Sequence, residues 1–359
     1  LGKHYVEMGK IMSLSNPIYL DVAGPHIILV SGKRGSGKSY TLGVITEGLA
    51  DLSPDIAQNI SFIIFDTMGI FWTMKYPNYR DDELLKEWGL APKGLAPTIF
   101  VPFGLFDDYQ SKGVPCDVAF AIRPSEVSAG EWAEIFGIDL LSEVGVLLER
   151  TVAKAKETLG TFEIKELVNV IEIDKEADKK EKQVLRNKFS AADKWGIFRE
   201  DATAITELAM AGNTSIIDLS AYTQMENGER LKALVMGLIC KKLLEHRMAA
   251  RKAEEVKLIS EGGFLFGAQS AQASEQAPLV WLLIDEAHEF LPRVGKTLAS
   301  NALIQILREG RQPGISLVLA TQQPGKIHTD VMTQADIVLS HRVTSKIDVS
   351  ALNEISATY

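Results

Sequence analysis

A glycine-rich stretch near the N-terminus, GKRGSGKS at residues 32–39, fits the Gly-x-x-x-x-Gly-Lys-Ser pattern of the Walker A motif. Glycines at these positions let the backbone turn tightly enough for its N–H groups to face phosphate oxygens. A lysine ammonium can neutralise the β- and γ-phosphates, and a serine hydroxyl can bind Mg²⁺. The pattern therefore predicts binding of ATP and Mg²⁺, with candidate contacts at Gly32, Gly35, Ser36, Gly37, Lys38, Ser39 and Tyr40.

Two adjacent carboxylates form a second candidate centre, far along the chain. Asp285 and Glu286 follow an apolar run and begin the sequence Asp-Glu-Ala-His. Two acids at the end of a buried strand are costly to bury unless a cation or hydrogen-bond donors lie nearby. We therefore expect Asp285 to hold Mg²⁺ and Glu286 to polarise the water that attacks ATP. His288 could hydrogen-bond near this site, and a packing role would suit it equally well.

Further polar groups follow the acidic pair. Thr321 and Gln322 end an apolar run, where a glutamine can orient water and sense the γ-phosphate. Arg308 and Arg311 lie three residues apart on the helix expected before that run. On residue types alone, an exposed helix face shared with Glu309 would account for both arginines.

The segments that would position these residues alternate between strand and helix patterns. Residues 26–31, HIILVS, form a short continuous apolar run, as is typical of a buried parallel strand. Residues 40–50 place apolar side chains at helical spacing, and similar strand patterns occur at 278–284, 315–320 and 335–343. The sequence therefore predicts an α/β fold with a mostly parallel sheet.

The distance along the chain between the Walker A motif and the acidic pair exceeds what a plain doubly wound core needs, so an insertion is expected. Residues 106–212 have mostly helical patterns, with repeated i, i+3, i+4 apolar positions and alternating charges. This insertion could serve subunit contacts or a partner, or be purely structural. The expected organisation is an N-terminal segment (1–25), a first core part (26–105), a helical insertion (106–212), a second core part (213–345) and a C-terminal segment (346–359).

Composition bounds the class of protein. No apolar run approaches the roughly 20 residues that span a bilayer, and the N-terminus lacks the apolar stretch of a signal peptide. The two cysteines, Cys116 and Cys240, lie outside any Cys-x-x-Cys spacing, which favours buried thiols in a reducing cytoplasm. A net charge of −9 argues against a basic coat over the whole surface, but a local basic lining could still meet phosphates.

Several nucleotide-dependent classes fit poorly. Superfamily 2 helicases follow the Asp-Glu-Ala-His box with a Ser/Thr-Ala-Thr motif and a second motor domain, and neither fits here. The chain has no Leu-Ser-Gly-Gly-Gln of ABC ATPases and no Asn-Lys-x-Asp of GTPases. A small-molecule P-loop kinase would not explain Glu286 or the two arginines.

Taken together, the motifs resemble the HerA/FtsK group of hexameric DNA-translocating ATPases, and the HerA branch most. The resemblance covers about 26–105 and 213–350, without the small N-terminal barrel of HerA proteins. The family's second strand often ends in Asp-x-x-Gly-Glu, but Ile70 replaces the final acid here, so the role of that acid does not carry over. The motifs that carry the resemblance are GKRGSGKSYTLG, DEAH, REGR, ATQQP and a strand ending near His341-Arg342.

This resemblance implies a RecA-like P-loop NTPase core, ATP and Mg²⁺ as ligands, and a homohexamer. Arg311 matches the position from which HerA-like proteins extend an arginine into the neighbouring subunit's site, and Arg308 is its companion candidate. The implied partners are double-stranded DNA and a nuclease in DNA end processing or defence. The acidic charge keeps open a second hypothesis, a nucleotide-gated ring scaffold that assembles and activates an effector protein with little translocation.

Basic residues that could line a pore do not stand out. Lys75, Lys326 and His328 are candidates for contacts with DNA phosphates. The basic residues in the second half of the long helix expected at 228–255, among them Arg247, are best explained as a solvated helix end.

Overall fold

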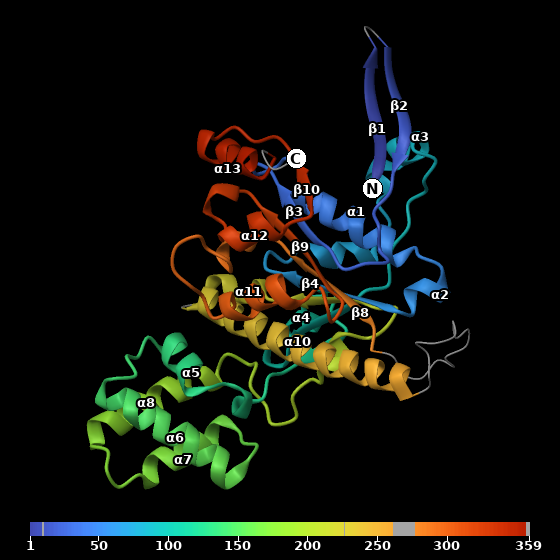
Figure 1. Ribbon diagram of the computed structural model, residues 1–359. Coiled ribbons are helices and arrows are strands. Elements are labelled where there is room, and N and C mark those ends of the chain that lie inside the picture. The colour runs from blue at the N-terminus through green and yellow to red at the C-terminus, as the bar shows by residue number, and fades with distance from the viewer. Residues whose placement is uncertain (9–10, 226, 261–276, 357–359) are drawn as a thin grey trace.

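The computed structural model describes residues 1–8, 11–225, 227–260 and 277–356, and its centre is a parallel β-sheet (Figure 1). Within these residues eight strands follow the order β10–β3–β9–β8–β4–β7–β5–β6, and every neighbouring pair is parallel. The predicted α/β class with a mostly parallel sheet is thereby confirmed. In chain order the strands are β3 (Ile27–Ser31), β4 (Ile60–Asp66), β5 (Thr98–Pro102), β6 (Val118–Phe120), β7 (Thr214–Asp218), β8 (Leu279–Ile284), β9 (Ile315–Thr321) and β10 (Ile337–Ser340).

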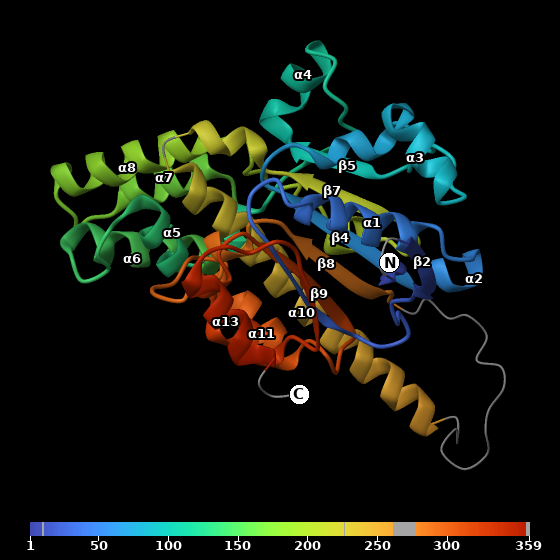
Figure 2. The ribbon, with the colours of Figure 1, turned by 90° about the horizontal axis from the view of Figure 1, so that it is seen from above.

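The strands are almost continuously apolar because helices cover both faces of the sheet. Every residue of β4 and β9 is buried. On one face, α1 (Lys38–Ala50) packs Leu42, Ile45 and Leu49 against the strands. Figure 2 shows α1 on one side of the sheet and the helices α10 (Gly228–Ser260) and α11 (Ser300–Glu309) on the other.

The carboxyl ends of the parallel strands form the edge that positions the predicted site. Ser31 of β3 pairs in register with Thr321 of β9, and Ile284 of β8 pairs with Leu319. The glycine-rich loop after β3, the acids after β8 and the polar pair at the end of β9 therefore lie side by side. This edge is where open α/β sheets bind their ligands.

Four helices form a separate unit beside the sheet: α5 (Ala129–Phe136), α6 (Glu143–Leu159), α7 (Ile164–Ile173) and α8 (Lys179–Asp193) (Figure 1). Its core surrounds the fully buried Trp132, which contacts the rings of Phe136, Phe189 and Phe198. The unit lies within the segment expected to be a helical insertion. Within the same segment, α4 (Phe103–Ser111) has no buried residue, and β6 is an edge strand of the sheet.

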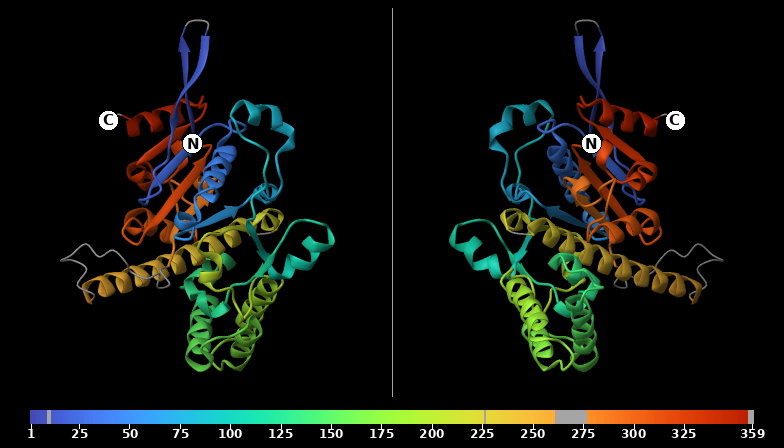
Figure 3. Two further views of the ribbon diagram at one scale, coloured as in Figure 1. Left: turned by 90° about the vertical axis from the view of Figure 1, so that its right-hand side faces the viewer. Right: turned by 90° about the vertical axis from the view of Figure 1, so that its left-hand side faces the viewer.

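The two ends of the described chain lie near the same end of the molecule (Figure 1). An antiparallel hairpin of β1 (Gly2–Met8) and β2 (Ile11–Ile18) projects there, opposite the helical unit, as Figure 3 shows. Among the described helices, none has the length and apolar character needed to cross a bilayer. The remaining described α-helices are α2 (Pro54–Ala57), α3 (Asp82–Glu87), α9 (Ile205–Leu208), α12 (Thr329–Gln334) and α13 (Lys346–Ser356).

Gly196, after the helical unit, touches the core at Gly104 and supplies a test of this junction. Gly196 has a φ of +65°, and a Cβ built on it would lie 2.7 Å from the Gly104 Cα. We expect Gly196→Ala to lower the free energy of unfolding by about 2 kcal/mol or more, because backbone strain and overpacking add. Gly113 has a similar φ of +69° with open space around it, so Gly113→Ala should show the backbone cost alone. Equal losses for the two variants in denaturant unfolding would contradict a tight junction.

Candidate functional site

The glycine-rich loop has the backbone shape of a phosphate cradle. It joins β3 to α1, and Gly35 and Gly37 have φ values of +75° and +102°, which side chains with a Cβ rarely adopt. Gly37 is the N-cap of α1 and makes no side-chain cap bond, so the N–H groups of the first helical turn are free to face an anion. The hydroxyl of Ser36 is buried and has no hydrogen-bond partner among the described residues. The loop therefore fits a bound polyphosphate.

The two predicted metal ligands meet in the structure. The Ser39 hydroxyl donates a hydrogen bond of 2.5 Å to Asp285 Oδ2, which joins the first turn of α1 to the end of β8. Asp285 is 3% exposed, and Lys38, the residue before Ser39, is also buried. A hydroxyl and a carboxylate oxygen are the hard ligands that Mg²⁺ prefers, with phosphate and water completing its octahedron. The donor set therefore fits Mg²⁺.

Glu286 is held in a strained position beside this pair. Its φ of 50° and ψ of 41° are left-handed, a conformation that costs a non-glycine residue about 1–3 kcal/mol. Its Oε2 atom is buried and has no hydrogen-bond partner among the described residues. Burial, followed by the charge of Asp285, raises the pKa of Glu286, and the charges of Lys38 and Arg34 oppose that rise. A carboxylate with an unpaired buried oxygen is suited to accept a proton from water.

His288 links the acidic strand to the neighbouring strand. Its Nδ1 lies 3.2 Å from Thr321 Oγ1, and its Nε2 lies 3.2 Å from Gln323 Nε2. Burial lowers the pKa of His288, as do the charges of Lys326 and then Lys38, which favours the neutral ring. Of the two sequence hypotheses for His288, the structure supports hydrogen bonding beside the site.

The end of β9 completes the group. Thr321 is buried, and its hydroxyl also accepts the N–H of Gln323 at 3.1 Å. The backbone N–H of Gln322 faces the Glu286 carboxylate and partly offsets the rise in its pKa that burial causes. The structure thus brings together Lys38, Ser39, Asp285, Glu286 and Gln322.

Sequence analysis missed the role of β10 in this site. The backbone N–H of Lys33 donates to the Arg342 carbonyl at 3.0 Å, and His341 Nε2 lies 2.9 Å from Thr41 Oγ1. A Cβ on Gly32 would lie 2.6 Å from the His341 Cβ, which explains the glycine at that position. His341 and Arg342 therefore hold the outer side of the phosphate loop. Their motif was visible, but pairing between β10 and β3 is not encoded in local spacing.

A second buried acidic pair lies on the same edge of the sheet. Asp66 and Asp218 end β4 and β7 in register. Burial raises the pKa of Asp66 to about 6. The N–H groups of Gly69 and Phe71 donate to its carboxylate at 2.7 and 2.8 Å and act in the opposite direction, lowering the pKa. These bonds fix the turn after β4. Like Asp285, Asp66 stands at the end of an apolar run, and this pattern could have identified it as a buried acid at the end of a strand.

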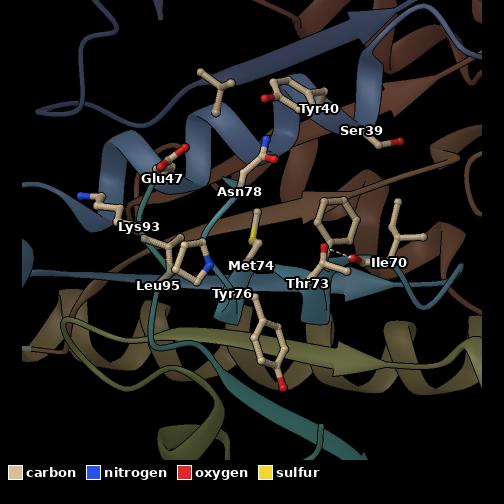
Figure 4. Close-up of a pocket in the computed structure, with 14 residues that line it drawn as sticks. Ser39, Tyr40, Glu47, Ile70, Thr73, Met74, Tyr76, Asn78, Lys93 and Leu95 are labelled. Carbon is tan, nitrogen blue, oxygen red and sulfur yellow. Dashed lines mark hydrogen bonds between the residues drawn. The ribbon is translucent and has the colours of Figure 1, made fainter. Parts of the chain in front are cut away.

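A cavity of about 560 Å³ borders the site between α1 and the turn after β4 (Figure 4). Ser39 and Tyr40 line one end, and Glu47 and Lys93 line the other. Ile70, which stands where the HerA family often has an acid, also lines this cavity and is 40% exposed. The cavity is therefore continuous with the first turn of α1 and carries no acid at that position.

Arg308 and Arg311 lie away from the phosphate loop of their own chain. Arg308 Nε donates to Asp330 Oδ2 at 2.6 Å, whereas the exposed Arg311 has no side-chain partner among the described residues. The turn that carries Arg311 lies at the start of β8, because its Gly314 carbonyl accepts a hydrogen bond from the Val280 N–H. Since Asp285 follows the end of β8, one strand length, about 16 Å, separates this turn from the acids.

The three candidate DNA contacts differ in availability. Lys75 Nζ pairs with both carboxylate oxygens of Asp117 at 2.5 and 2.6 Å. His328 Nδ1 accepts the N–H of Asp330 at 3.1 Å and caps α12. Lys326 is exposed, and its side chain has no bonded partner in the described part of the chain. Of the three, Lys326 is the residue left free to meet a phosphate.

Comparisons with known proteins match this arrangement. The chain matches the family model described as "Helicase HerA, central domain" over residues 6–243, and the model for zonular occludens toxin over residues 212–355. The first match spans most of the chain and includes the glycine-rich loop.

Curated relatives extend the likeness along the whole chain. It is 24% identical over 372 residues to the probable DNA double-strand break repair helicase HerA of Methanocaldococcus jannaschii, covering 98% of this chain and 69% of that protein. It is 23% identical over 367 residues to the DNA double-strand break repair helicase HerA of Pyrococcus furiosus, covering 97% and 62%. The chain therefore spans about two thirds of the length of these relatives.

Among solved structures, VirB4 of Thermoanaerobacter pseudethanolicus superposes with a TM-score of 0.55 and 13% identity. The match covers 92% of this chain and 80% of that one. At this identity the likeness shows a shared fold.

Proposed function

Because this chain belongs to the HerA central-domain family, we propose that it is an ATP-driven motor that translocates double-stranded DNA as a homohexamer. One observation carries the proposal. The candidate metal ligands and the candidate base lie at the carboxyl ends of the strands, and the unpartnered Arg311 lies at their amino ends.

The hydrolytic half of the site follows from the contacts above. Lys38 would neutralise the β- and γ-phosphates, and Ser39 and Asp285 would hold Mg²⁺. When bound there, Mg²⁺ would supply positive charge that stabilises the phosphates. Glu286 polarises the attacking water, and Gln322, whose backbone N–H faces Glu286, orients that water against the γ-phosphate.

The site is completed by a second subunit. An arginine at the γ-phosphate stabilises transition-state charge, and Arg311 cannot reach the γ-phosphate of its own chain. A head-to-tail contact that puts Arg311 beside the neighbour's phosphate loop repeats from subunit to subunit, and it forms a ring when the rotation between subunits closes. Arg308 has a different task, because its bond to Asp330 ties α11 to α12.

The substrate proposal rests on the relatives and on charge. Both relatives are named as DNA double-strand break repair helicases. A net charge of −9 restricts contacts with DNA to local basic positions such as Lys326. We propose that the motor serves a nuclease partner in DNA end processing or defence.

ATPase rates with and without linear double-stranded DNA test this proposal. We expect a several-fold rise in the rate with DNA, and a steep loss of that rise as salt increases, because phosphate contacts release counterions. Single-stranded oligonucleotides of equal nucleotide content serve as the control.

A ring scaffold that activates an effector protein is the second candidate. The helical unit of α5–α8, which lies beside the sheet, offers a surface for such a partner (Figure 1). An ATPase rate that DNA leaves unchanged and a purified nuclease or effector raises would favour this scaffold over the motor.

A further inference from the structure

Arg247, in the middle of α10, is a buried cation, which corrects the expectation of a solvated helix end. Its side chain is 2% exposed. Its Nε donates to the Pro313 carbonyl at 2.8 Å, and its Nη1 donates to the Ala277 carbonyl at 2.5 Å. Glu254 Oε1 lies 3.7 Å from Nη1 and supplies the nearby negative charge. A buried guanidinium with two carbonyl acceptors makes strong, charge-assisted bonds.

The Pro313 carbonyl belongs to the turn 310–314, which carries Arg311. Within this turn, the bond from the Gly314 N–H to the Arg311 carbonyl is long, at 3.3 Å. The Ile315 N–H closes the turn by donating to the Gly310 carbonyl at 2.8 Å, and Pro313 has no N–H to donate. Gly314 lies close to the same guanidinium, because a Cβ on it would be 3.5 Å from Arg247 Nη2. Arg247 therefore ties the turn to α10 and to Ala277, two residues before β8.

We propose that Arg247 is a positioning residue that holds Arg311 for the neighbouring subunit's site. The inference rests on the proposed function, because it needs Arg311 to act between subunits. Arg311 is exposed and unpartnered within the described chain, so its own contacts do not fix it. A catalytic group must be held to within roughly 0.5 Å, and a displacement of about 1 Å can cost 10²-fold in rate.

The test uses mixed rings in which each subunit type has one defect. Lys38→Ala subunits lack the phosphate contact but keep Arg311, and Arg311→Ala subunits keep the phosphate site. Their mixture has active sites only where the two types meet. We expect this reference mixture to hydrolyse ATP, and each variant alone to be inactive.

Arg247→Met is then placed in one subunit type at a time, since methionine keeps much of the buried volume without the donors. In the Lys38→Ala subunit, which lends the arginine, it should lower the mixture's rate by about 10²-fold. In the Arg311→Ala subunit, which lends the phosphate site, it should leave the rate near the reference. A structural role in folding or ring assembly predicts equal losses in both placements, and that result would overturn the inference.

Arg247→Lys repeats the test if Arg247→Met fails to assemble, because lysine keeps the charge and one carbonyl bond. The same asymmetry with a smaller loss is expected, and symmetric or absent losses contradict the inference. Ring mass and binding of a fluorescent ATP analogue confirm assembly in every case. An inactive reference mixture instead overturns the shared site itself, so the two failures are distinguishable.

Discussion

Arg311→Ala should lower the rate of ATP hydrolysis by about 10³–10⁵-fold, the range that arginine fingers contribute in GTPases. The change should leave ATP affinity within a few-fold of the wild type. The reason is geometric, because Arg311 lies a strand length from the metal ligands of its own chain and contributes nothing to them. Steady-state hydrolysis and fluorescent-nucleotide titration measure the two effects.

Arg308→Ala is the matched control. Arg308 lies three residues earlier and is 62% exposed, but its Nε already donates a hydrogen bond to Asp330 Oδ2 at 2.6 Å. Its loss should change hydrolysis by a few-fold at most, through the packing of α12. Equal losses for Arg308→Ala and Arg311→Ala would show a general effect of positive charge on this surface. Full-speed turnover by isolated monomers would remove the need for a neighbour.

The hydrolytic centre was accessible to sequence analysis because its parts are local. The Walker A residues are contiguous, so their spacing predicts the turn and the start of α1 before any tertiary contact is known. Asp285 and Glu286 follow a buried strand directly, and parallel strands place such ends at one edge. The 2.5 Å contact between Ser39 and Asp285 is what that reasoning predicts.

Contacts between distant segments were not accessible in the same way. Arg247 has the sequence context of a solvated helix end, and its burial depends on carbonyls supplied by Ala277 and Pro313. His341 reaches Thr41 only because β10 pairs with β3. Strand β6 is three residues long, too short for its alternation to be distinguished from a loop. Each of these features depends on contacts between segments far apart in the sequence, which local residue patterns do not predict.

Glu286→Gln should lower hydrolysis by about 10²–10⁴-fold and leave ATP bound, because the amide cannot accept a proton from water. Glutamine keeps the volume of the side chain and still has a carbonyl oxygen for the N–H of Gln322, so the strained turn should persist. With ATP bound and not hydrolysed, the shared site stays occupied between subunits. The ring should then dissociate more slowly than the wild type in ATP, as mass measurements after dilution would show.

Glu289→Gln separates this effect from general loss of acidity, because Glu289 is an exposed carboxylate three residues away. It should retain hydrolysis within a few-fold of the wild type. If Glu286→Gln hydrolysed ATP nearly as fast as Glu289→Gln in single-turnover measurements, the buried Oε2 without a bonded partner would need another explanation. In that case another group at the carboxyl ends of the strands would have to activate the water, and this outcome would point to His288, whose Nδ1 lies 3.6 Å from Glu286 Oε2.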